Sequence, residues 1–177
     1  MNRAQIIMAR FDMAEYRLCR GLNRGAGLRW VCTPFQVASR LGDGIVWYVL
    51  ICALPLVYGR TALRPSLVMA VTGLMGILIY KWLKSRLLRE RPFIRHPGIT
   101  LATPPLDRYS FPSGHTLHAV AFTWLAAERF PELAWFLIPL TGLIAASRIV
   151  LGLHYPTDVL AGGAIGATLA MLAQNFI

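Results

Sequence analysis

The stretch "SFPSGHTLHA", residues 110–119, places a serine, a glycine and two histidines at the start of a long uncharged run. Pro112 precedes Ser113, and no charged residue follows until Glu128. A helix that begins here has unpaired backbone N–H groups and the positive end of its dipole at its first turn, and both favour a bound anion. The stretch therefore predicts a helix whose first turn lies beside an anionic ligand.

Uncharged runs of this kind recur along the chain. Of its 177 residues, 56% are hydrophobic and only 15% are charged, which is less charge than a soluble domain of this size uses to cover its surface. Five runs approach the length of a membrane span: 44–59, 65–80, 109–127, 133–147 and 159–177. The fourth reaches this length if Arg148 and the apolar residues after it are included. The sequence predicts an all-α, polytopic membrane helix bundle with about five transmembrane helices.

Turn residues and charges place the ends of these helices. The expected spans cover approximately residues 43–59, 66–83, 113–129, 133–151 and 156–177. A loop with four prolines separates the second span from the third. In the fifth span, Gly162, Gly163 and Gly166 are small enough to allow close contact with another helix.

Residues 1–42 are expected to form an N-terminal interfacial segment, apart from a membrane-embedded domain at 43–177. The first 24 residues are too charged to contain the core of a cleavable signal peptide. Their apolar residues recur at helical spacing and their arginines lie on another face, which predicts an amphipathic helix in the headgroup region. An ordinary surface helix packed on the bundle fits the pattern equally well. Residues 25–42 are expected to be interfacial or re-entrant, because they contain Arg29, Pro34 and Arg40. In the first 24 residues, the apolar face consists of Ile7, Phe11, Ala14, Leu18 and Leu22, and the basic face consists of Arg3, Arg10, Arg17 and Arg24.

The net charge of +10 is concentrated rather than spread over a face. Seven of the 18 basic residues lie between Lys81 and Arg108, in and around one loop between spans. This distribution argues against nucleic acid, which would need an exposed basic face on a soluble fold. Anionic lipid headgroups or a phosphorylated substrate are the expected partners. The three cysteines lack metal-site spacing and are interpreted as apolar filler.

Three polar clusters lie at the ends of spans that share one membrane face: Lys84 to Arg91, Ser113 to His118, and Arg148 to Asp158. They are far apart in sequence and are expected to converge in space. Lys84 and Arg91 are seven residues apart, on one side of a helix that extends beyond the membrane, where they suit phosphate binding. Basic residues at the end of a span also serve as lipid anchors, and Lys81, Arg86 and Arg89 are interpreted in that way.

In the second cluster, Gly114 lets a phosphate approach the backbone, and Ser113 is either a phosphate ligand or only an N-cap. His115, at the mouth of the helix, is a candidate proton donor to a leaving oxygen. His118, one turn further in, is expected to pack or hydrogen-bond inside the bundle. A metal site formed by His115 and His118 is disfavoured.

In the third cluster, Arg148 is a cation inside an apolar run, where its cost indicates a functional partner. His154 and Asp158 fit a base and the carboxylate that fixes its tautomer, although such a pair by itself is more often structural. With only eight acidic residues in the chain, a site of several carboxylate-bound metals is disfavoured. We therefore expect no metal and no cofactor, with phosphate charge neutralised by Lys and Arg and a histidine as the nucleophile.

Three motifs carry a family resemblance. "KSRLLRERP" has a lysine, six residues and Arg-Pro, "PSGH" follows, and "SRIVLGLHYPTD" has Ser-Arg, five residues, His, three residues and Asp. In order and spacing, these motifs across residues 84–158 resemble those of the type 2 phosphatidic acid phosphatase (PAP2) superfamily, which shares its site with vanadium haloperoxidases. Residues 1–40 lie outside the resemblance, and the expected five spans differ from the six of well-known bacterial relatives.

The resemblance implies a metal-independent phosphatase. In it, phosphate would be held by Lys84, Arg91, Ser113, Gly114 and Arg148. His154 would attack phosphorus, Asp158 would orient His154, and His115 would protonate the leaving group. The expected activity is that of a lipid phosphatase in a bacterial inner membrane, acting on undecaprenyl pyrophosphate with its site on the periplasmic face. A phosphatase for phosphatidate or phosphatidylglycerol phosphate is the alternative enzyme, and a non-catalytic lipid-binding or transport protein is the alternative of another class.

Overall fold

The computed structural model describes residues 3–177, and among these the side chains of residue 10 and of residues 12–177. Every regular element in this part of the chain is a helix, as predicted. The α-helices are α1 Arg3–Asn23, α2 Arg29–Arg40, α3 Val46–Tyr58, α4 Leu63–Leu87, α5 Pro92–Arg95, α6 Gly114–Arg129, α7 Ala134–Val150 and α8 Pro156–Ala173.

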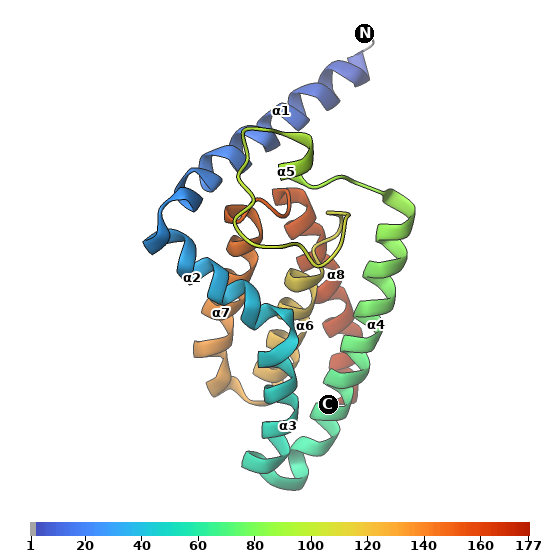
Figure 1. The fold of residues 1–177 in the computed structure, drawn as a ribbon. Helices are drawn as coiled ribbons and strands as arrows, with labels where there is room; N and C mark the ends of the chain where they lie inside the picture. Colours follow the sequence, from blue (N-terminus) through green and yellow to red (C-terminus); the bar gives the residue numbers. More distant parts are fainter. Residues whose placement is uncertain (1–2) are drawn as a thin grey trace.

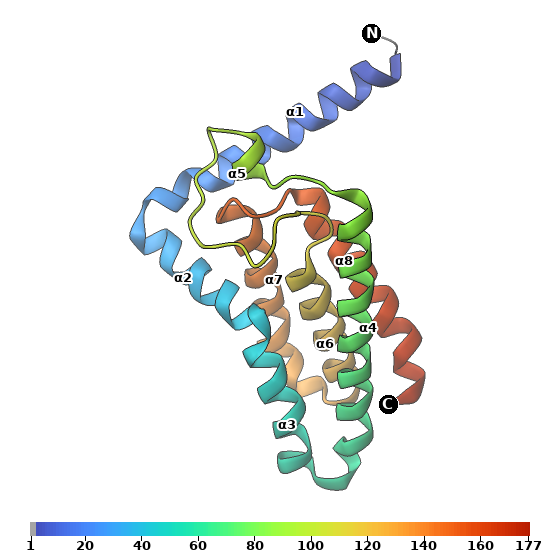
Figure 2. The same ribbon diagram turned by 45° about the vertical axis from the view of Figure 1, so that its right-hand side comes forward.

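Helices α3, α4, α6, α7 and α8 run side by side as a bundle, and α1, α2 and α5 gather at one end of it (Figures 1 and 2). Helix α6 lies in the middle, packed against α4, α7 and α8. It is rich in small and apolar residues that are buried, among them Leu117, Ala121 and Leu125. Their neighbours in the core include Trp47 and Met69, so the apolar interior is built around α6.

The contact between α6 and α8 depends on two glycines. A Cβ atom on Gly162 would lie 2.4 Å from the carbonyl oxygen of Ser113, and one on Gly166 would lie 2.3 Å from that of Leu117. Neither distance is possible for a real side chain, so glycine is required at both positions for the helices to come this close. The predicted close contact is therefore confirmed for Gly162 and Gly166. Gly163 faces side chains no nearer than 3.8 Å and is not needed for it.

The outer surface of the bundle is apolar. Three helical stretches are long and apolar enough to cross a membrane: residues 29–87, 131–150 and 156–176. Large apolar side chains such as Leu56 and Trp135 are more than four-fifths exposed, at 86% and 88%. An exposed apolar surface of this extent belongs in lipid, which confirms a membrane-embedded helical protein.

Residues 25–42 lie at the end of the bundle where α1 and α5 also lie. Helix α2 packs on α7 and continues into α3 through a single widened turn at Leu41–Ile45. The bend occurs at Gly44, whose φ of 132° is in the region that favours glycine. Whether α2 lies at the interface or enters the membrane stays a prediction, as does the domain boundary at residue 42.

Helix α1 docks on the bundle with a polar face, which was not expected. Among its described side chains, the buried ones are Glu15, Cys19 and Asn23, spaced four residues apart along one side of the helix. Leu18 and Leu22, from the predicted apolar face, remain about half exposed. The helix is thus packed on the bundle while part of its apolar face stays free. The side chains of Arg3, Ile7 and Phe11, which also belong to the predicted pattern, lie outside the described residues.

Candidate active site

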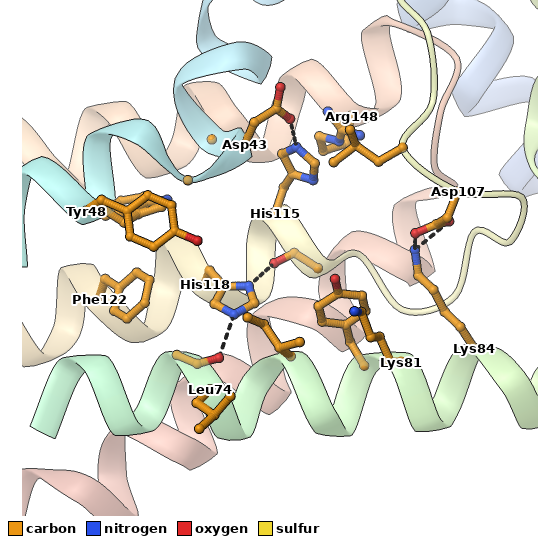
Figure 3. A pocket seen from close by; sticks show the side chains of 18 of the residues that line it. Asp43, Tyr48, Leu74, Lys81, Lys84, Asp107, His115, His118, Phe122 and Arg148 are labelled. Carbon is orange, nitrogen blue, oxygen red and sulfur yellow. Dashed lines mark hydrogen bonds and ion pairs between the residues drawn. The ribbon is translucent and has the colours of Figure 1, made fainter.

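The three polar clusters meet at the end of the bundle where α1, α2 and α5 lie (Figure 1). They surround one end of a cavity of about 770 Å³, which is shown in Figure 3. Six of the eight predicted site residues line it; Ser113 and Asp158 lie behind its wall. The six are Lys84, Arg91, Gly114, His115, Arg148 and His154.

His154 lies in the short connection between α7 and α8 and is almost completely buried. Its backbone N–H donates to the carbonyl of Arg148 at 2.9 Å, which holds the connection against the end of α7. Nε2 of the ring lies 3.2 Å from Nη1 of Arg91. Because a guanidinium group can only donate, Nε2 must hold a lone pair and the ring proton must be on Nδ1.

The protonation state of His154 follows from its surroundings. Burial, and then the positive charges of Arg148 and Arg91, lower the pKa of His154 well below its usual value. The imidazole is therefore neutral at ordinary pH. A neutral ring with its lone pair directed at a group of cations is an available nucleophile for an anion bound among them.

Asp158, in the first turn of α8, lies on the other side of the His154 ring. Its Oδ2 is 3.7 Å from Nδ1 of His154, beyond hydrogen-bond distance, and accepts a hydrogen bond of 2.8 Å from the backbone N–H of Tyr155. Its Oδ1 accepts from Nη1 of Arg89 at 2.7 Å. Among the described residues, Nδ1 of His154 has no hydrogen-bond partner, so Asp158 is the acceptor best placed for its proton.

Lys84 and Arg91 converge on one carboxylate. Nζ of Lys84 lies 2.7 Å from one oxygen of Asp107, and Nη2 of Arg91 lies 2.8 Å from the other. Partial burial alone would raise the pKa of Asp107, but the hydrogen bonds and charges of Lys84 and Arg91 outweigh it, and the pKa lies below its usual value. Burial lowers the pKa of Arg91, which nevertheless stays cationic. The two cations thus bind an anion in the position where a phosphate is expected.

Arg148, at the end of α7, is the third cation and is almost completely buried. Its Nη1 donates to the hydroxyl of Ser39 in α2. Within the described part of the chain, its Nε has no hydrogen-bond partner. An unpaired donor on a buried guanidinium is costly, and a phosphate oxygen would satisfy it.

Ser113 is the N-cap of α6. Its hydroxyl accepts from the backbone N–H of Thr116 at 3.4 Å and is 3.0 Å from the hydroxyl of the same residue. The side chain is fully buried and does not reach the cavity wall. Of the two roles left open by the sequence, the structure shows the capping role. Gly114, next in the chain, does line the cavity beside the helix N-terminus.

His115 pairs with a carboxylate that the sequence did not indicate. Its Nε2 lies 2.5 Å from Oδ1 of Asp43, which belongs to the bend between α2 and α3. Figure 3 shows the other ring nitrogen turned away from Asp43, on the side of the ring nearer Arg148. Of the three histidines that line the cavity, His115 and His154 each have a carboxylate beside the ring, Asp43 and Asp158.

The other end of the cavity is apolar. Beyond His118 the walls come from α3 and α4 and include Trp47, Ile51 and Leu74. His118 hydrogen-bonds inside the bundle, as expected, with Nδ1 2.8 Å from the carbonyl of Gly114 and Nε2 3.0 Å from that of Gly73. The cavity thus joins a charged end to an apolar end. This shape suits a molecule with an anionic head and a hydrocarbon chain.

Comparison with known proteins agrees with this geometry. The family model described as "PAP2 superfamily" matches residues 61–177. The chain belongs to the PAP2 superfamily. The undecaprenyl-diphosphatase BcrC of Bacillus subtilis is 33% identical over 133 residues, which are 75% of this chain and 68% of that protein. An undecaprenyl-diphosphatase of Sulfolobus acidocaldarius is 30% identical over 137 residues, 76% of this chain and 65% of that protein.

The PAP2 assignment extends to the fold. The crystal structure of LpxE from Aquifex aeolicus superposes with a TM-score of 0.77 at 24% identity, over 90% of this chain and 94% of that one. The superposition therefore includes elements that precede residue 61, where the family match begins. The helices that carry the three PAP2 motifs thus share their arrangement with a solved structure.

Three residues of this PAP2 site were missed or misjudged from the sequence. Asp43 pairs with His115 across 72 residues, and Glu15 pairs with Arg89 across 74. Arg89 was interpreted as a lipid anchor, but its guanidinium group binds Asp158. The available signal was that Asp43 is an isolated acid beside an apolar run and that Glu15 lies among the arginines of the first 24 residues.

Proposed function

We propose that the protein is an integral-membrane lipid phosphatase that works through a phosphohistidine at His154, with undecaprenyl pyrophosphate as its substrate and undecaprenyl phosphate as its product. The observation that carries the proposal is the lone pair on Nε2 of His154, directed at cations at the charged end of a cavity whose other end is apolar. Its PAP2 membership and its undecaprenyl-diphosphatase relatives place it among hydrolases of phosphate esters and anhydrides.

The first chemical step forms the phosphoenzyme. The phosphate displaces Asp107 from Lys84 and Arg91. Its oxygens are then held by these two residues and Arg148, and by the backbone at Gly114 at the N-terminus of α6. The lone pair on Nε2 of His154 forms a bond to phosphorus, while the bond from phosphorus to the leaving oxygen breaks. The leaving oxygen takes a proton from His115. Asp158 stabilises the positive charge that develops on the His154 ring.

The second step releases phosphate. A water molecule gives a proton to His115, and its oxygen attacks phosphorus as the bond to Nε2 breaks. His154 returns to its neutral form, and inorganic phosphate leaves the group of cations. Asp43, on the far side of the His115 ring, favours the protonated ring that the first step needs and the second step restores.

The substrate is tested with a panel. Purified protein in detergent is assayed for phosphate release from undecaprenyl pyrophosphate, phosphatidate and phosphatidylglycerol phosphate at equal surface concentrations. We expect the highest kcat/KM for the polyprenyl pyrophosphate. A higher value for either glycerolipid would assign the alternative substrate. No release from any lipid, with lipid binding retained, would assign a binding or transport protein.

We further propose that the chemistry needs no metal. The nearby carboxylates are already paired, Asp107 with Lys84 and Arg91, and Asp158 with Arg89. Activity should therefore survive excess EDTA, and orthovanadate should inhibit because it mimics pentavalent phosphorus. Loss of activity on chelation that magnesium restores would contradict this mechanism.

For the topology, we propose five membrane-spanning helices, α3, α4, α6, α7 and α8, in a bacterial inner membrane with the site on the periplasmic face. The site lies where α4 and α7 end and where α6 and α8 begin, so a single face holds the charged end of the cavity (Figure 2). The lipid headgroup would approach at this face, with its chain in the apolar end between α3 and α4. Helix α6 has 16 residues, and of the five helices only α3, with 13, is shorter. Helix α6 is packed between α4, α7 and α8 in the middle of the bundle.

A further inference from the structure

Helix α1 covers the segment that carries the catalytic histidine. Its buried face contacts that segment at three successive turns. Asn23 donates to the carbonyl of Val150 at 2.8 Å, and the thiol of Cys19 faces the carbonyl of His154 at 3.9 Å. Glu15 accepts from the backbone N–H of Thr157 at 3.0 Å. A helix that precedes the family match therefore contacts the chain on both sides of His154.

The closest link between α1 and the site passes through Arg89. Its Nη2 donates to Oε2 of Glu15 at 2.6 Å, and its Nη1 donates to Oδ1 of Asp158 at 2.7 Å. The same Nη1 is 2.7 Å from the hydroxyl of Thr157, and the guanidinium group lies 4.1 Å from the centre of the Tyr155 ring. The planar guanidinium group of Arg89 is thus contacted along two edges, by Glu15 and by Asp158 with Thr157, and on one face by Tyr155.

The two carboxylates that Arg89 joins are buried and need a compensating positive charge. Glu15 and Asp158 are both buried, and each alone would be an uncompensated carboxylate. Arg89 neutralises part of both, and the charges of Asp158 and Glu15 outweigh its burial and raise the pKa of Arg89. Without Glu15, Arg89 would keep Asp158 as its only carboxylate partner and would be held on one edge only.

The orientation of Asp158 depends on this arrangement. Its Oδ1 is occupied by Arg89, and its Oδ2 faces both the backbone N–H of Tyr155 and the His154 ring. A carboxylate fixed through Oδ1 cannot rotate Oδ2 away from Nδ1 of His154. That orientation keeps an acceptor on the Nδ1 side of the ring, which favours the same tautomer as the contact of Arg91 with Nε2.

We propose that Glu15 and Arg89 are positioning residues that hold Asp158, and through it His154, in the geometry needed for attack, so that α1 is part of the catalytic apparatus. The inference rests on the proposed function, in which His154 is the nucleophile. Neither residue touches the substrate in this scheme. Both should affect the rate of the chemical steps and not the binding of the phosphate.

The test uses the 177-residue chain with Glu15→Gln, Arg89→Lys and Arg89→Met. Glu15→Gln keeps the shape and removes the charge. We expect kcat to fall on the order of 10- to 100-fold, as is typical when the group that orients a functional imidazole is lost, with KM changed less than about threefold. Arg89→Met should lose at least as much, and Arg89→Lys should lose less. Because Glu15 acts through Arg89, the double variant Glu15→Gln/Arg89→Met should be no slower than Arg89→Met.

The matched control is Asp12→Asn. Asp12 lies on the same helix and also faces an arginine, Arg95, but at 3.7 Å and with both side chains more than half exposed. It should leave kcat, KM and the melting temperature unchanged. An unchanged kcat in Glu15→Gln would overturn the proposal. So would a loss of activity that merely follows a loss of folded protein, or additive effects in the double variant.

A second readout does not need turnover. Orthovanadate should raise the melting temperature of the wild type, because its binding to His154 depends on the same lone pair. In Glu15→Gln, the vanadate concentration needed for the same rise in melting temperature should be on the order of tenfold higher. In Asp12→Asn, it should equal that of the wild type. If the wild type releases no phosphate from any lipid, the proposed function fails. The vanadate titration then still decides the role of Glu15, since equal titrations in wild type and Glu15→Gln would overturn it.

Discussion

At the scale of single residues, the site is arranged around the two nitrogens of His154. Arg91 requires a lone pair on Nε2, and the carboxylate of Asp158 lies on the opposite side of the ring, 3.7 Å from Nδ1. His115 also has a carboxylate beside its ring, that of Asp43. The proposed mechanism assigns the attack to His154 and the proton donation to His115, and both are buried in the same cavity.

Substitution of the two histidines should give different losses. His154→Ala should abolish turnover and any covalent phosphoenzyme, because no neighbour replaces its nitrogen. His115→Ala should lower kcat on the order of 10²–10⁴-fold, and by much less for p-nitrophenyl phosphate, whose leaving group needs no proton. The measurement is acid-quench trapping with labelled substrate, which detects acid-labile, base-stable phosphohistidine. Labelled enzyme in His154→Ala would show that the roles are assigned wrongly.

Asp43 offers a separate test of the proton donor. Asp43→Asn keeps a hydrogen-bonding group beside His115 but removes the charge that favours its protonated form. We expect a smaller loss of kcat than in His115→Ala, and no further loss when the two are combined, because Asp43 acts only through His115. Steady-state rates with a polyprenyl pyrophosphate and with p-nitrophenyl phosphate decide this. An equal loss with both substrates would contradict a role in leaving-group protonation.

The sequence predicted the components of the site better than their connections. Lys84, Arg91, His115, Arg148 and His154 are all brought to one cavity, because span ends on one face must converge. The partners that orient them were not predictable. Asp43 and His115 are far apart in the chain, and they meet because the turn Leu41–Ile45 packs on α6. Glu15 reaches Arg89 because α1 packs on α7 and α8.

At the scale of helices, the register between α6 and α8 decides where the site residues meet. Gly166→Ala would place a methyl group 2.3 Å from the carbonyl oxygen of Leu117 and push the helices apart. We expect a destabilisation of about 1–3 kcal/mol, as is typical of overpacking, and a fall in kcat. Gly163→Ala is the matched control on the same helix, with no side chain closer than 3.8 Å. Thermal unfolding in detergent checks both, and equal melting temperatures would contradict the close-contact argument.

The helix boundaries were predictable because the chain marks them locally. Apolar runs end at charges or turn residues, and the observed bounds of α6 and α7, Gly114–Arg129 and Ala134–Val150, nearly coincide with the predicted spans. The docking face of α1 was not predictable. A hydrophobic pattern favours Leu18 and Leu22, whereas the structure buries Glu15 and Cys19 because their partners are polar groups near the site.

At the scale of the whole molecule, the proposed orientation conflicts with part of the charge distribution. With the site on the periplasmic face, the arginines of α1 lie on that side as well, against the usual excess of positive charge in the cytoplasm. Arg60, Arg64 and Arg129 at the opposite end offset this only in part. A reporter fused after Ile177 should read cytoplasmic, and one fused after Gly98 should read periplasmic. The reverse pair of signals would overturn the orientation.

In the protein without substrate, the carboxylate of Asp107 competes with phosphate for Lys84 and Arg91. Because the carboxylate is tethered beside Lys84 and Arg91, its effective concentration there is on the order of millimolar, and any dissolved phosphate must displace it. A lipid has an additional source of binding energy in its chain and displaces Asp107 at a lower concentration than free phosphate or a small phosphate ester does. Asp107→Asn should therefore make the enzyme more sensitive to inhibition by inorganic phosphate. In that view, the loop between α5 and α6 selects among ligands by favouring a phosphate that carries a hydrocarbon tail.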